Sequence, residues 1–288
     1  MADKDNFLLR SAAWAARMLP VPVKRAFYKI PFLARLIRRS LNEAAPQGIA
    51  EVKIAGGILR GLSMALDLHT EKDYWLGTYE PDLQAAALQF IKPGMVVYDV
   101  GANIGYISLM AARLAGESGR VFSFEALPAN IDRLTRNVAL NAMQDRVQIV
   151  HAAVVDKPGE ATFFSHASGA MGKAEGSAGR DEHYTQTIKV TGIALDDFVF
   201  RQGNPPPAVI KMDIEGGEGM ALAGMPRLLK ETRPALLIEL HGQEAARQVW
   251  DCLKANRYTL RYMSAGSALI QSLDVLDWKA YVIAAPDI

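Results

Sequence analysis

Seven short apolar segments recur in the second part of the chain, and most of them alternate with helical patterns. The segments are apolar along their whole length, which is typical of strands that are buried on both faces of a sheet. Helical patterns follow the first, second, fourth and fifth of them, as in strands joined by helical crossovers. The sequence therefore predicts an α/β fold with a doubly wound, mostly parallel seven-stranded sheet, built from residues 95–100, 120–125, 147–154, 207–213, 234–241, 258–263 and 279–284.

Three regions are expected along the 288 residues. Residues 1–45 predict a basic helical arm. Residues 46–90 predict a β-hairpin, with strands at 51–54 and 58–66 around Gly56-Gly57, and a helix that leads into the core. Residues 91–288 predict the domain that carries the sheet.

An inserted β-hairpin interrupts the alternation between the third and fourth segments. Residues 162–165 and 185–191 read as an added pair of strands, and residues 166–184 between them are rich in Gly, Ser and Ala. A loop of this length in a domain is usually a substrate lid or disordered. We expect a lid here, with disorder as the alternative.

The basic charge of the chain is concentrated near its start. Through Gly48 there are nine Lys or Arg against three acids, a net +6, so that the remaining residues carry −5 and the whole chain +1. The arm, with helices expected at 6–19 and 32–41, either packs on the domain or makes a peripheral contact with anionic lipid at the inner face of the membrane. The near-neutral total offers no argument for nucleic acid. A single cysteine, Cys252, and the lack of a secretory pattern favour the cytoplasm.

The first apolar segment runs into a glycine-containing turn that predicts a nucleoside site. Asp99, Gly101, Asn103 and Gly105 recur at every second position, and the glycines allow a tight turn with a close approach of ligand and helix. Dinucleotide sites place a diphosphate at G-x-G-x-x-G, but here Asn103 replaces the middle glycine and Asp99 would repel diphosphate. A carboxylate suits the ammonium and sulfonium groups of S-adenosylmethionine, which favours this cofactor over NAD.

The second apolar segment ends in Glu125, twenty residues beyond Gly105. An acid at this position accepts hydrogen bonds from both hydroxyls of a ribose in nucleoside-binding sheets. The alternative is a helix cap near Pro128. Together with the turn, Glu125 predicts a cofactor-binding domain over residues 91–288.

The motifs together resemble the FkbM family of methyltransferases, over residues 74–281. Besides the turn and Glu125, the resemblance rests on Tyr74-Trp75-x-Gly77-x-Tyr79-Glu80, Pro93-Gly94-Met95, Pro128, Asn137 with Asn141, Leu195-Asp196-Asp197, residues 211–218 (Lys-Met-Asp-Ile-Glu-Gly-Gly-Glu) and Glu239-Leu240-His241. It implies a Rossmann-like class I enzyme that uses S-adenosylmethionine to methylate hydroxyls of sugars, glycolipids and polyketides. The chain departs from the family pattern at Ala126-Leu127, because many relatives place Pro directly after the acid.

The fourth and fifth segments supply candidates for the chemistry. Asp213, Glu215, Glu239 and His241 follow two strands that are expected to be neighbours, and ligands of open α/β sheets bind at the carboxyl edge. His241 is the expected general base, because a reference pKa near 6.5 leaves it largely neutral. Glu239 or Glu215 would orient it. The alternative is a histidine that caps the helix starting at Gln243.

More specific roles are expected for three further residues. Asp213 is expected to touch the methionine part of the cofactor. Lys211, in mid-strand, is expected to pair with a buried carboxylate. Glu80 is expected to bind the amino group of the cofactor or to cap its own helix.

No metal site is predicted, although an acidic cluster with a histidine is also compatible with Mg²⁺.

Asn204-Pro205-Pro206 resembles the base-gripping motif of adenine methyltransferases, but it precedes the strand and lacks the aromatic residue, so a rigid loop is the better interpretation. An NAD-dependent oxidoreductase and a non-catalytic cofactor-binding protein remain as alternatives. The acceptor and the oligomeric state are left open.

Overall fold

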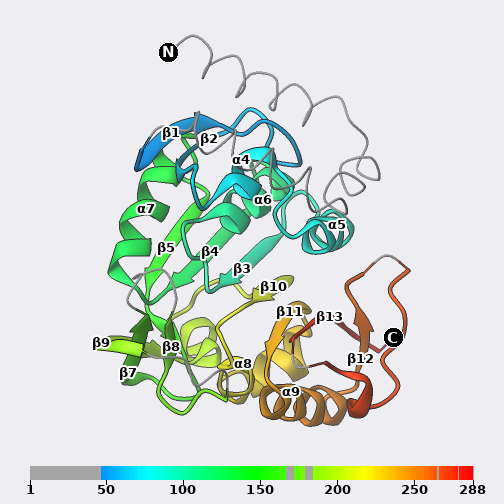
Figure 1. The fold of residues 1–288 in the computed structure, drawn as a ribbon. Helices are drawn as coiled ribbons and strands as arrows, with labels where there is room; N and C mark the ends of the chain where they lie inside the picture. Colours follow the sequence, from blue (N-terminus) through cyan, green and yellow to red (C-terminus); the bar gives the residue numbers. More distant parts are fainter. Residues whose placement is uncertain (1–46, 167–171, 179–183, 265, 278, 288) are drawn as a thin grey trace. The chain divides into compact units, whose positions relative to one another are not determined.

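The computed structural model describes residues 47–166, 172–178, 184–264, 266–277 and 279–287 (Figure 1). The chain divides into two units, one ending at Pro81 and one beginning at Asp82. The division therefore groups the helix after Pro81 with the sheet. The predicted arm of residues 1–45 lies outside the described residues.

The first unit contains an antiparallel pair of strands, β1 (Ile49–Lys53) and β2 (Ser63–Asp67), followed by helix α4 (Lys72–Leu76). The pair was predicted, but its second strand begins at Ser63 and not at residue 58. The reason is that residues 54–62 form a longer connection, in which the amide of Gly61 donates to the carbonyl of Ile54. The Gly56-Gly57 pair is part of this connection and does not form a two-residue turn.

The second unit is built on the predicted seven-stranded sheet. Its order is β12-β13-β11-β10-β3-β4-β5, and β13 is the strand that runs opposite to the other six. Strands form within all seven predicted segments: β3 (Val96–Val100), β4 (Arg120–Glu125), β5 (Val147–His151), β10 (Val209–Met212), β11 (Ala235–His241), β12 (Tyr258–Tyr262) and β13 (Lys279–Pro286). The third segment, predicted over residues 147–154, ends as a strand of this sheet at His151, and residues 153–154 pair in another sheet.

Helices follow the first, second, fourth and fifth of these strands as predicted, namely α6 (Tyr106–Ala115), α7 (Pro128–Ala139), α8 (Glu218–Ala223) and α9 (Gln243–Ala255). The predicted helix α5 (Pro81–Phe90) leads into β3. The structure adds the π-helices η1 (Asp197–Arg201) before β10 and η2 (Leu228–Thr232) before β11, and the 3₁₀-helix η3 (Leu273–Val275) before β13. The chain runs outward from β3 to β5 and then returns to β10 on the other side of β3. Parallel strands are almost always joined by right-handed crossovers, and with this order such crossovers place the helices of the two halves on opposite faces of the sheet. The order reverses between β3 and β10, and this is where open α/β sheets bind ligands.

An aromatic cluster fixes the middle of the sheet to η1. Phe198 packs edge-on against Tyr98, Phe122 and Phe124, with ring centroids 5.2–5.8 Å apart. The hydroxyl of Tyr98 donates to the carbonyl of Pro205 at 2.8 Å. The proline-rich segment is therefore held against the core before β10 begins, in keeping with its interpretation as a rigid loop.

The insertion forms a second sheet of four strands in the order β6-β9-β7-β8. The predicted pair corresponds to β7 (Gly159–His166) and β9 (Tyr184–Ile193), with β6 (Ala153–Val154) and β8 (Gly172–Ala174) added at the two edges. Part of the predicted lid is thus a strand, because β7 offers a free edge to which β8 pairs. Residues 167–171 and 179–183 lie outside the described residues, so the lid stays a prediction.

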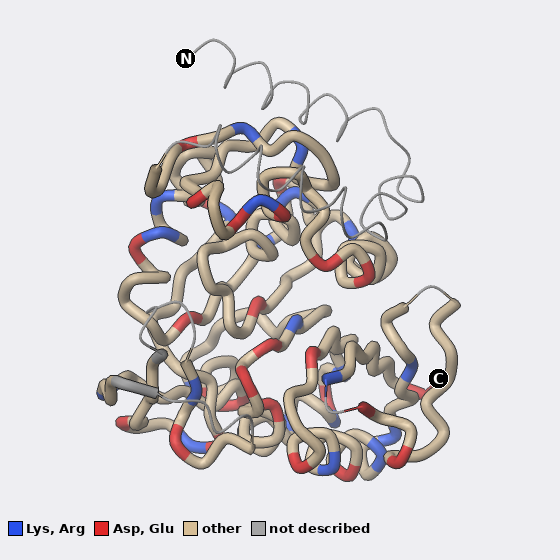
Figure 2. Tube along the Cα trace, in the orientation of Figure 1, with Lys and Arg blue, Asp and Glu red and all other residues tan. Residues whose placement is uncertain are grey.

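Charges on the surface of the second unit pair locally. On α9, acidic and basic residues follow one another (Figure 2), and Arg247 contacts Glu244 at 2.6 Å and Asp251 at 3.4 Å. Within the described ranges, no helix combines the length and the apolar character that crossing a membrane requires.

Candidate active site

The turn between β3 and α6 adopts the conformation that its glycines predict. Gly101, Asn103 and Gly105 all have left-handed backbones, with φ of 77°, 49° and 91°. A Cβ at Gly101 would lie 2.0 Å from the carbonyl oxygen of Asp213, and one at Gly105 would lie 2.4 Å from Leu134. Glycine is therefore required at Gly101 by the close approach of the backbone of Asp213 and is favoured at Gly105 by the left-handed backbone.

Asp99 pairs with a charged side chain of the neighbouring strand β10. Its side chain is fully buried, accepts a hydrogen bond from Ser108 Oγ at 2.6 Å and lies 3.2 Å from Nζ of Lys211. Since Asp99 and Lys211 are paired in the register of β3 and β10, the cation that meets this carboxylate belongs to the protein. The prediction that Lys211 pairs with a buried carboxylate is confirmed, whereas a direct contact of Asp99 with the cofactor stays a prediction.

Glu125 closes the turn from β4. One carboxylate oxygen accepts from the amide of Asn103 at 2.8 Å, and the other accepts from the amides of Ala126 and Leu127 at 3.0 and 2.8 Å. The two residues that precede Pro128 thus supply donors that keep the carboxylate in place. Burial raises the pKa of Glu125, although these hydrogen bonds act against the rise.

Asn137 steadies the same turn from α7, a role that the sequence analysis did not assign. Its side-chain amide donates to the carbonyl of Ile104 at 2.8 Å, and the side chain of Asn141 donates to the carbonyl of Asn137. The motif of two asparagines therefore links α7 to the start of α6.

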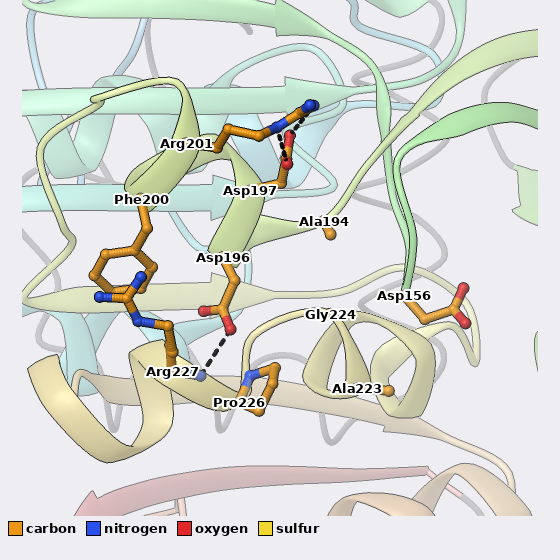
Figure 3. Close-up of a pocket in the computed structure, with 10 residues that line it drawn as sticks. All are labelled: Asp156, Ala194, Asp196, Asp197, Phe200, Arg201, Ala223, Gly224, Pro226 and Arg227. Carbon is orange, nitrogen blue, oxygen red and sulfur yellow. Dashed lines mark hydrogen bonds and ion pairs between the residues drawn. The ribbon is translucent and has the colours of Figure 1, made fainter.

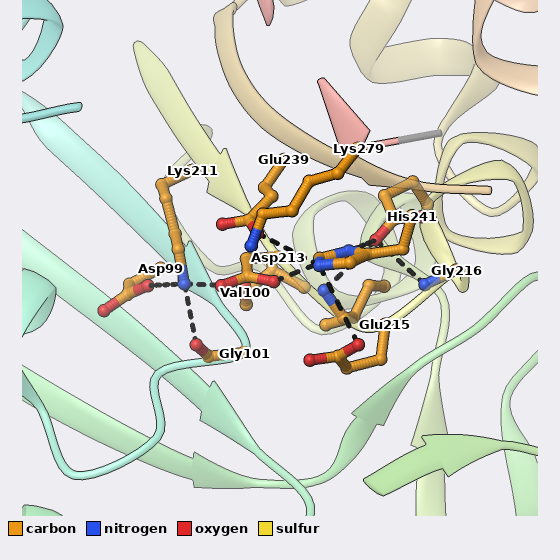
Figure 4. A network of polar contacts seen from close by, with 12 residues as sticks. Asp99, Val100, Gly101, Lys211, Asp213, Glu215, Gly216, Glu239, His241 and Lys279 are labelled. Atoms are coloured by element: carbon orange, nitrogen blue, oxygen red, sulfur yellow. Dashed lines mark hydrogen bonds and ion pairs between the residues drawn. The ribbon is translucent and has the colours of Figure 1, made fainter. Parts of the chain in front are cut away.

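The predicted acids gather around His241 at the carboxyl ends of β10 and β11 (Figure 4). His241 Nε2 lies 3.0 Å from Glu239 and 3.8 Å from Glu215, and Nδ1 lies 3.8 Å from Asp213. Nδ1 is also 3.7 Å from Glu218, whose role the sequence analysis missed. The side chain of His241 is 4% exposed, whereas those of Asp213 and Glu215 are 24% and 29% exposed. Ligands can therefore reach the two carboxylates, while the imidazole lies behind them.

The segment after β10 wraps around the imidazole in a strained conformation. Glu215 has φ of 54° and Gly216 has φ of 93°. Glu218 Oε1 accepts from the amides of Ile214 and Gly216, both at 3.2 Å, and so stabilises this turn. Non-glycine residues with left-handed backbones are costly and cluster at functional sites.

Lys279, the first residue of β13, is a second group that the sequence analysis did not assign. Its Nζ contacts Oε1 of the buried Glu239. Burial alone would raise the pKa of Glu239, but the hydrogen bonds from His241 and Lys279 lower it to about 2. Glu239 is therefore an ionised carboxylate at neutral pH.

The surrounding carboxylates change the protonation expected for His241. Burial alone would lower the pKa of the imidazole, but Glu218 and Glu239, together with the charges of Asp213 and Glu215, raise it to about 10. The expectation of a largely neutral ring is wrong for the ligand-free protein, because reference values omit such neighbours. The capping alternative for His241 is not observed either, since Gly242 is the N-cap of α9 and no side chain caps it.

Glu80 lies in the first unit, directly before Pro81, with φ of 42°. The structure does not relate its side chain to the sheet of the second unit. Its role toward a cofactor stays a prediction.

Asp213, Glu239 and His241 offer one donor atom each within 4.8 Å of one another, the arrangement among the described residues that is closest to a metal site. Oxygen and imidazole donors suit several divalent ions. However, the ammonium of Lys279 already meets Glu239. We therefore assign no metal here, and its absence stays a prediction.

A separate hollow of about 450 Å³ lies beside η1 and η2 and contains none of the predicted site residues (Figure 3). Most of its charged groups have partners within the protein. Asp196 accepts from the amides of Arg227 and Leu228, Arg201 pairs with Asp197, and the guanidinium of Arg227 lies 3.6 Å above the ring of Phe200. These contacts fix the start of η2, and we therefore assign the residues around the hollow a structural role.

Comparison with known proteins gives a matching family. The family described as Methyltransferase FkbM domain matches residues 99–263, more than half of the chain. Hexuronic acid methyltransferase AglP of Haloferax volcanii is 29% identical over 163 residues, which are 57% of this chain and 63% of that protein. The 31-O-demethyl-FK506 methyltransferase FkbM of Streptomyces tacrolimicus is 29% identical over 161 residues, 47% of this chain and 61% of that protein. The chain thus spans just over three fifths of the length of these relatives.

Among solved structures, methyltransferase FkbM from Methylobacillus flagellatus is similar at 16% identity with a TM-score of 0.44, over 76% of this chain and 53% of that one.

Proposed function

This chain belongs to the FkbM family of methyltransferase domains, and we propose that it transfers the methyl group of S-adenosylmethionine to a hydroxyl group of a sugar, glycolipid or polysaccharide. The name of the Streptomyces relative supports an oxygen acceptor, and the name of the Haloferax relative supports a hexuronic acid. A hydroxyl of a polyketide or another natural product is the alternative acceptor.

The observation that carries the proposal is that the glycine turn and the His241 cluster are contiguous. The backbone of Gly101 lies against the carbonyl oxygen of Asp213, and the carboxylate of Asp213 lies 3.8 Å from His241. A nucleoside site and a group of titratable side chains therefore share one edge of the sheet. This is the arrangement that methyl transfer needs, because donor and acceptor must be aligned beside a proton acceptor.

The residues present fit S-adenosylmethionine. Glu125 is an acceptor fixed beside Asn103, suited to hydroxyls of the ribose. Asp213 and Glu215 are the partly exposed carboxylates of the cluster, suited to positively charged groups. When bound, the cofactor supplies an electrophilic methyl group and positive charge.

His241 is the proposed proton acceptor, and its surroundings set the condition under which it can act. In the ligand-free protein the four carboxylates hold it as an imidazolium, which cannot accept a proton. Additional positive charge near Asp213 and Glu215 would weaken this hold, because like charges disfavour protonation. The neutral ring could then take the proton of an acceptor hydroxyl, with Glu239 keeping it oriented through Nε2.

The test is a methyl-transfer screen with labelled donor on uronic-acid glycans, glycolipids and macrolides, preceded by calorimetry with S-adenosylmethionine and S-adenosylhomocysteine. We expect uptake of both nucleosides and labelling of a sugar-containing acceptor. Labelling of macrolides alone would move the acceptor to the alternative class. A folded protein that takes up neither nucleoside would contradict the proposal.

Two controls separate other functions. NAD should not raise the unfolding temperature, in contrast to S-adenosylmethionine. His241→Ala should abolish transfer while it retains nucleoside affinity, since His241 lies behind the exposed carboxylates. Undiminished transfer by this variant would remove His241 from the chemistry.

A further inference from the structure

Lys279 reaches the candidate active site from a part of the chain far from the other site residues. It begins β13, the antiparallel strand next to β11, and the register places it opposite His241. Its Nζ contacts Oε1 of Glu239, and the same oxygen lies 3.0 Å from His241 Nε2. Two cationic groups therefore share one buried carboxylate oxygen.

The surroundings of Lys279 hold the ammonium at this position. The side chain is 42% exposed, so its stem extends from solvent toward the buried carboxylate. Nζ also lies 5.3 Å from the centre of the Tyr281 ring, two residues along the same face of β13. Aromatic faces attract ammonium groups at this distance. Tyr281 and Glu239 thus restrict the ammonium from two sides.

The charges that face His241 come from three parts of the fold. Asp213, Glu215 and Glu218 belong to the segment after β10, Glu239 to its own strand, and Lys279 to β13. The four carboxylates favour the imidazolium. Lys279 acts in the opposite direction, because it neutralises part of the charge on Glu239.

We propose that Lys279 is a positioning residue of the active site, which fixes the carboxylate of Glu239 and shares its negative charge so that His241 can release its proton. This inference rests on the proposed function of His241 as proton acceptor. The contact between Lys279 and Glu239, however, is present in the protein without ligands. It can therefore be tested without donor or acceptor.

The experiment follows His241 in ¹⁵N-histidine-labelled protein by NMR, with its resonance identified by its loss in His241→Gln. The raised pKa of the ring places its titration in the alkaline range, and the variants are compared at the pH where the wild-type ring is half charged. In Lys279→Met the ratio of charged to neutral ring should rise about tenfold, the effect of one nearby unit charge in a partly screened site. Lys279→Arg should restore the wild-type ratio. Lys254→Met, on the exposed face of α9, is the matched control and should not change it.

A ratio in Lys279→Met within twofold of the wild type would overturn the inference. If that variant does not fold, Lys279→Gln serves in its place, because it removes the charge and keeps a donor. In a Glu239→Gln background the Lys279→Met effect should shrink, since the shared carboxylate is gone. An undiminished effect there would also contradict action through Glu239.

Measurements of methyl transfer distinguish a failure of this inference from a failure of the proposed function. If methyl transfer is found, Lys279→Met should lower kcat and move the acid limb of the kcat profile to higher pH, with Lys279→Arg active. If no transfer is found but the NMR ratio changes as stated, the proposed function fails and the positioning of Glu239 by Lys279 stands.

Discussion

The Nζ atom of Lys211 lies 3.2 Å from Oδ1 of Asp99 and donates to the carbonyl oxygen of Gly101 at 2.7 Å. The side chains of both charged residues are nearly inaccessible to solvent. Since Ser108 binds the other oxygen of Asp99 and itself accepts from Ser123, the pair belongs to a buried polar chain that joins four elements, β10, β3, α6 and β4. Asp99 thus acts on the glycine turn through Lys211, which donates to the carbonyl oxygen of Gly101.

Replacing Lys211 by methionine should lower the free energy of unfolding by about 3–5 kcal/mol, because an unpaired carboxylate would remain buried. Urea unfolding followed by circular dichroism measures the change. Asp99→Asn in the Lys211→Met background should recover part of the loss. Lys230→Met, on the exposed surface of η2, is the control. A Lys211 variant as stable as this control would contradict the account of the pair.

Gly101→Ala should destabilise the protein by about 3 kcal/mol or more, because its Cβ would meet the backbone oxygen of Asp213 in addition to the cost of a left-handed alanine. Gly203→Ala is a matched control, since Gly203 has a similar φ of 78° but open space around it. It should cost about 1–2 kcal/mol. Thermal unfolding of the two variants gives the comparison, and equal losses would mean that the approach of β10 is unimportant.

Glu125→Gln should weaken the binding of S-adenosylmethionine by about 10- to 100-fold. Hydrogen bonds to a charged group contribute about 1.5–3 kcal/mol, and the NH2 of the amide would also face at least one of the three backbone donors that now hold the carboxylate. Calorimetric titration of the folded variant measures the affinity. Glu117→Gln, exposed after α6, is the control. Unchanged affinity in Glu125→Gln would separate this residue from the ribose.

The stability of the protein should depend on pH through His241. Its pKa is raised to about 10 in the folded state, against about 6.5 in an unfolded chain. The stabilising contribution is therefore complete below about pH 6.5 and is lost as the pH rises toward 10. Urea unfolding at pH 6, 8 and 9.5 should show a steeper decline for the wild type than for His241→Gln. His69→Gln should follow the wild type, and parallel declines in all three proteins would argue against a charged His241.

Local sequence patterns were sufficient for most of the architecture. The seven strands, the helices between them and the turn at Gly101 and Gly105 follow from apolar periodicity and backbone freedom, which neighbouring residues decide. The gathering of Asp213, Glu215, Glu239 and His241 could also be anticipated, because parallel strands present their carboxyl ends at one edge. The start of β2 at Ser63 could not, since a glycine pair allows more than one connection.

The sequence by itself determined the order of the elements and the residue types at the ligand edge of the sheet. Only the tertiary structure decided which charges meet. Asp99 meets Lys211 because β3 and β10 are neighbours in register, and Lys279 meets Glu239 because an antiparallel β13 lies beside β11. The raised pKa of His241 likewise comes from carboxylates that the fold brings around it, Glu218, Glu239, Asp213 and Glu215, because the pKa of a buried group depends on charges that are near in space and distant in the chain.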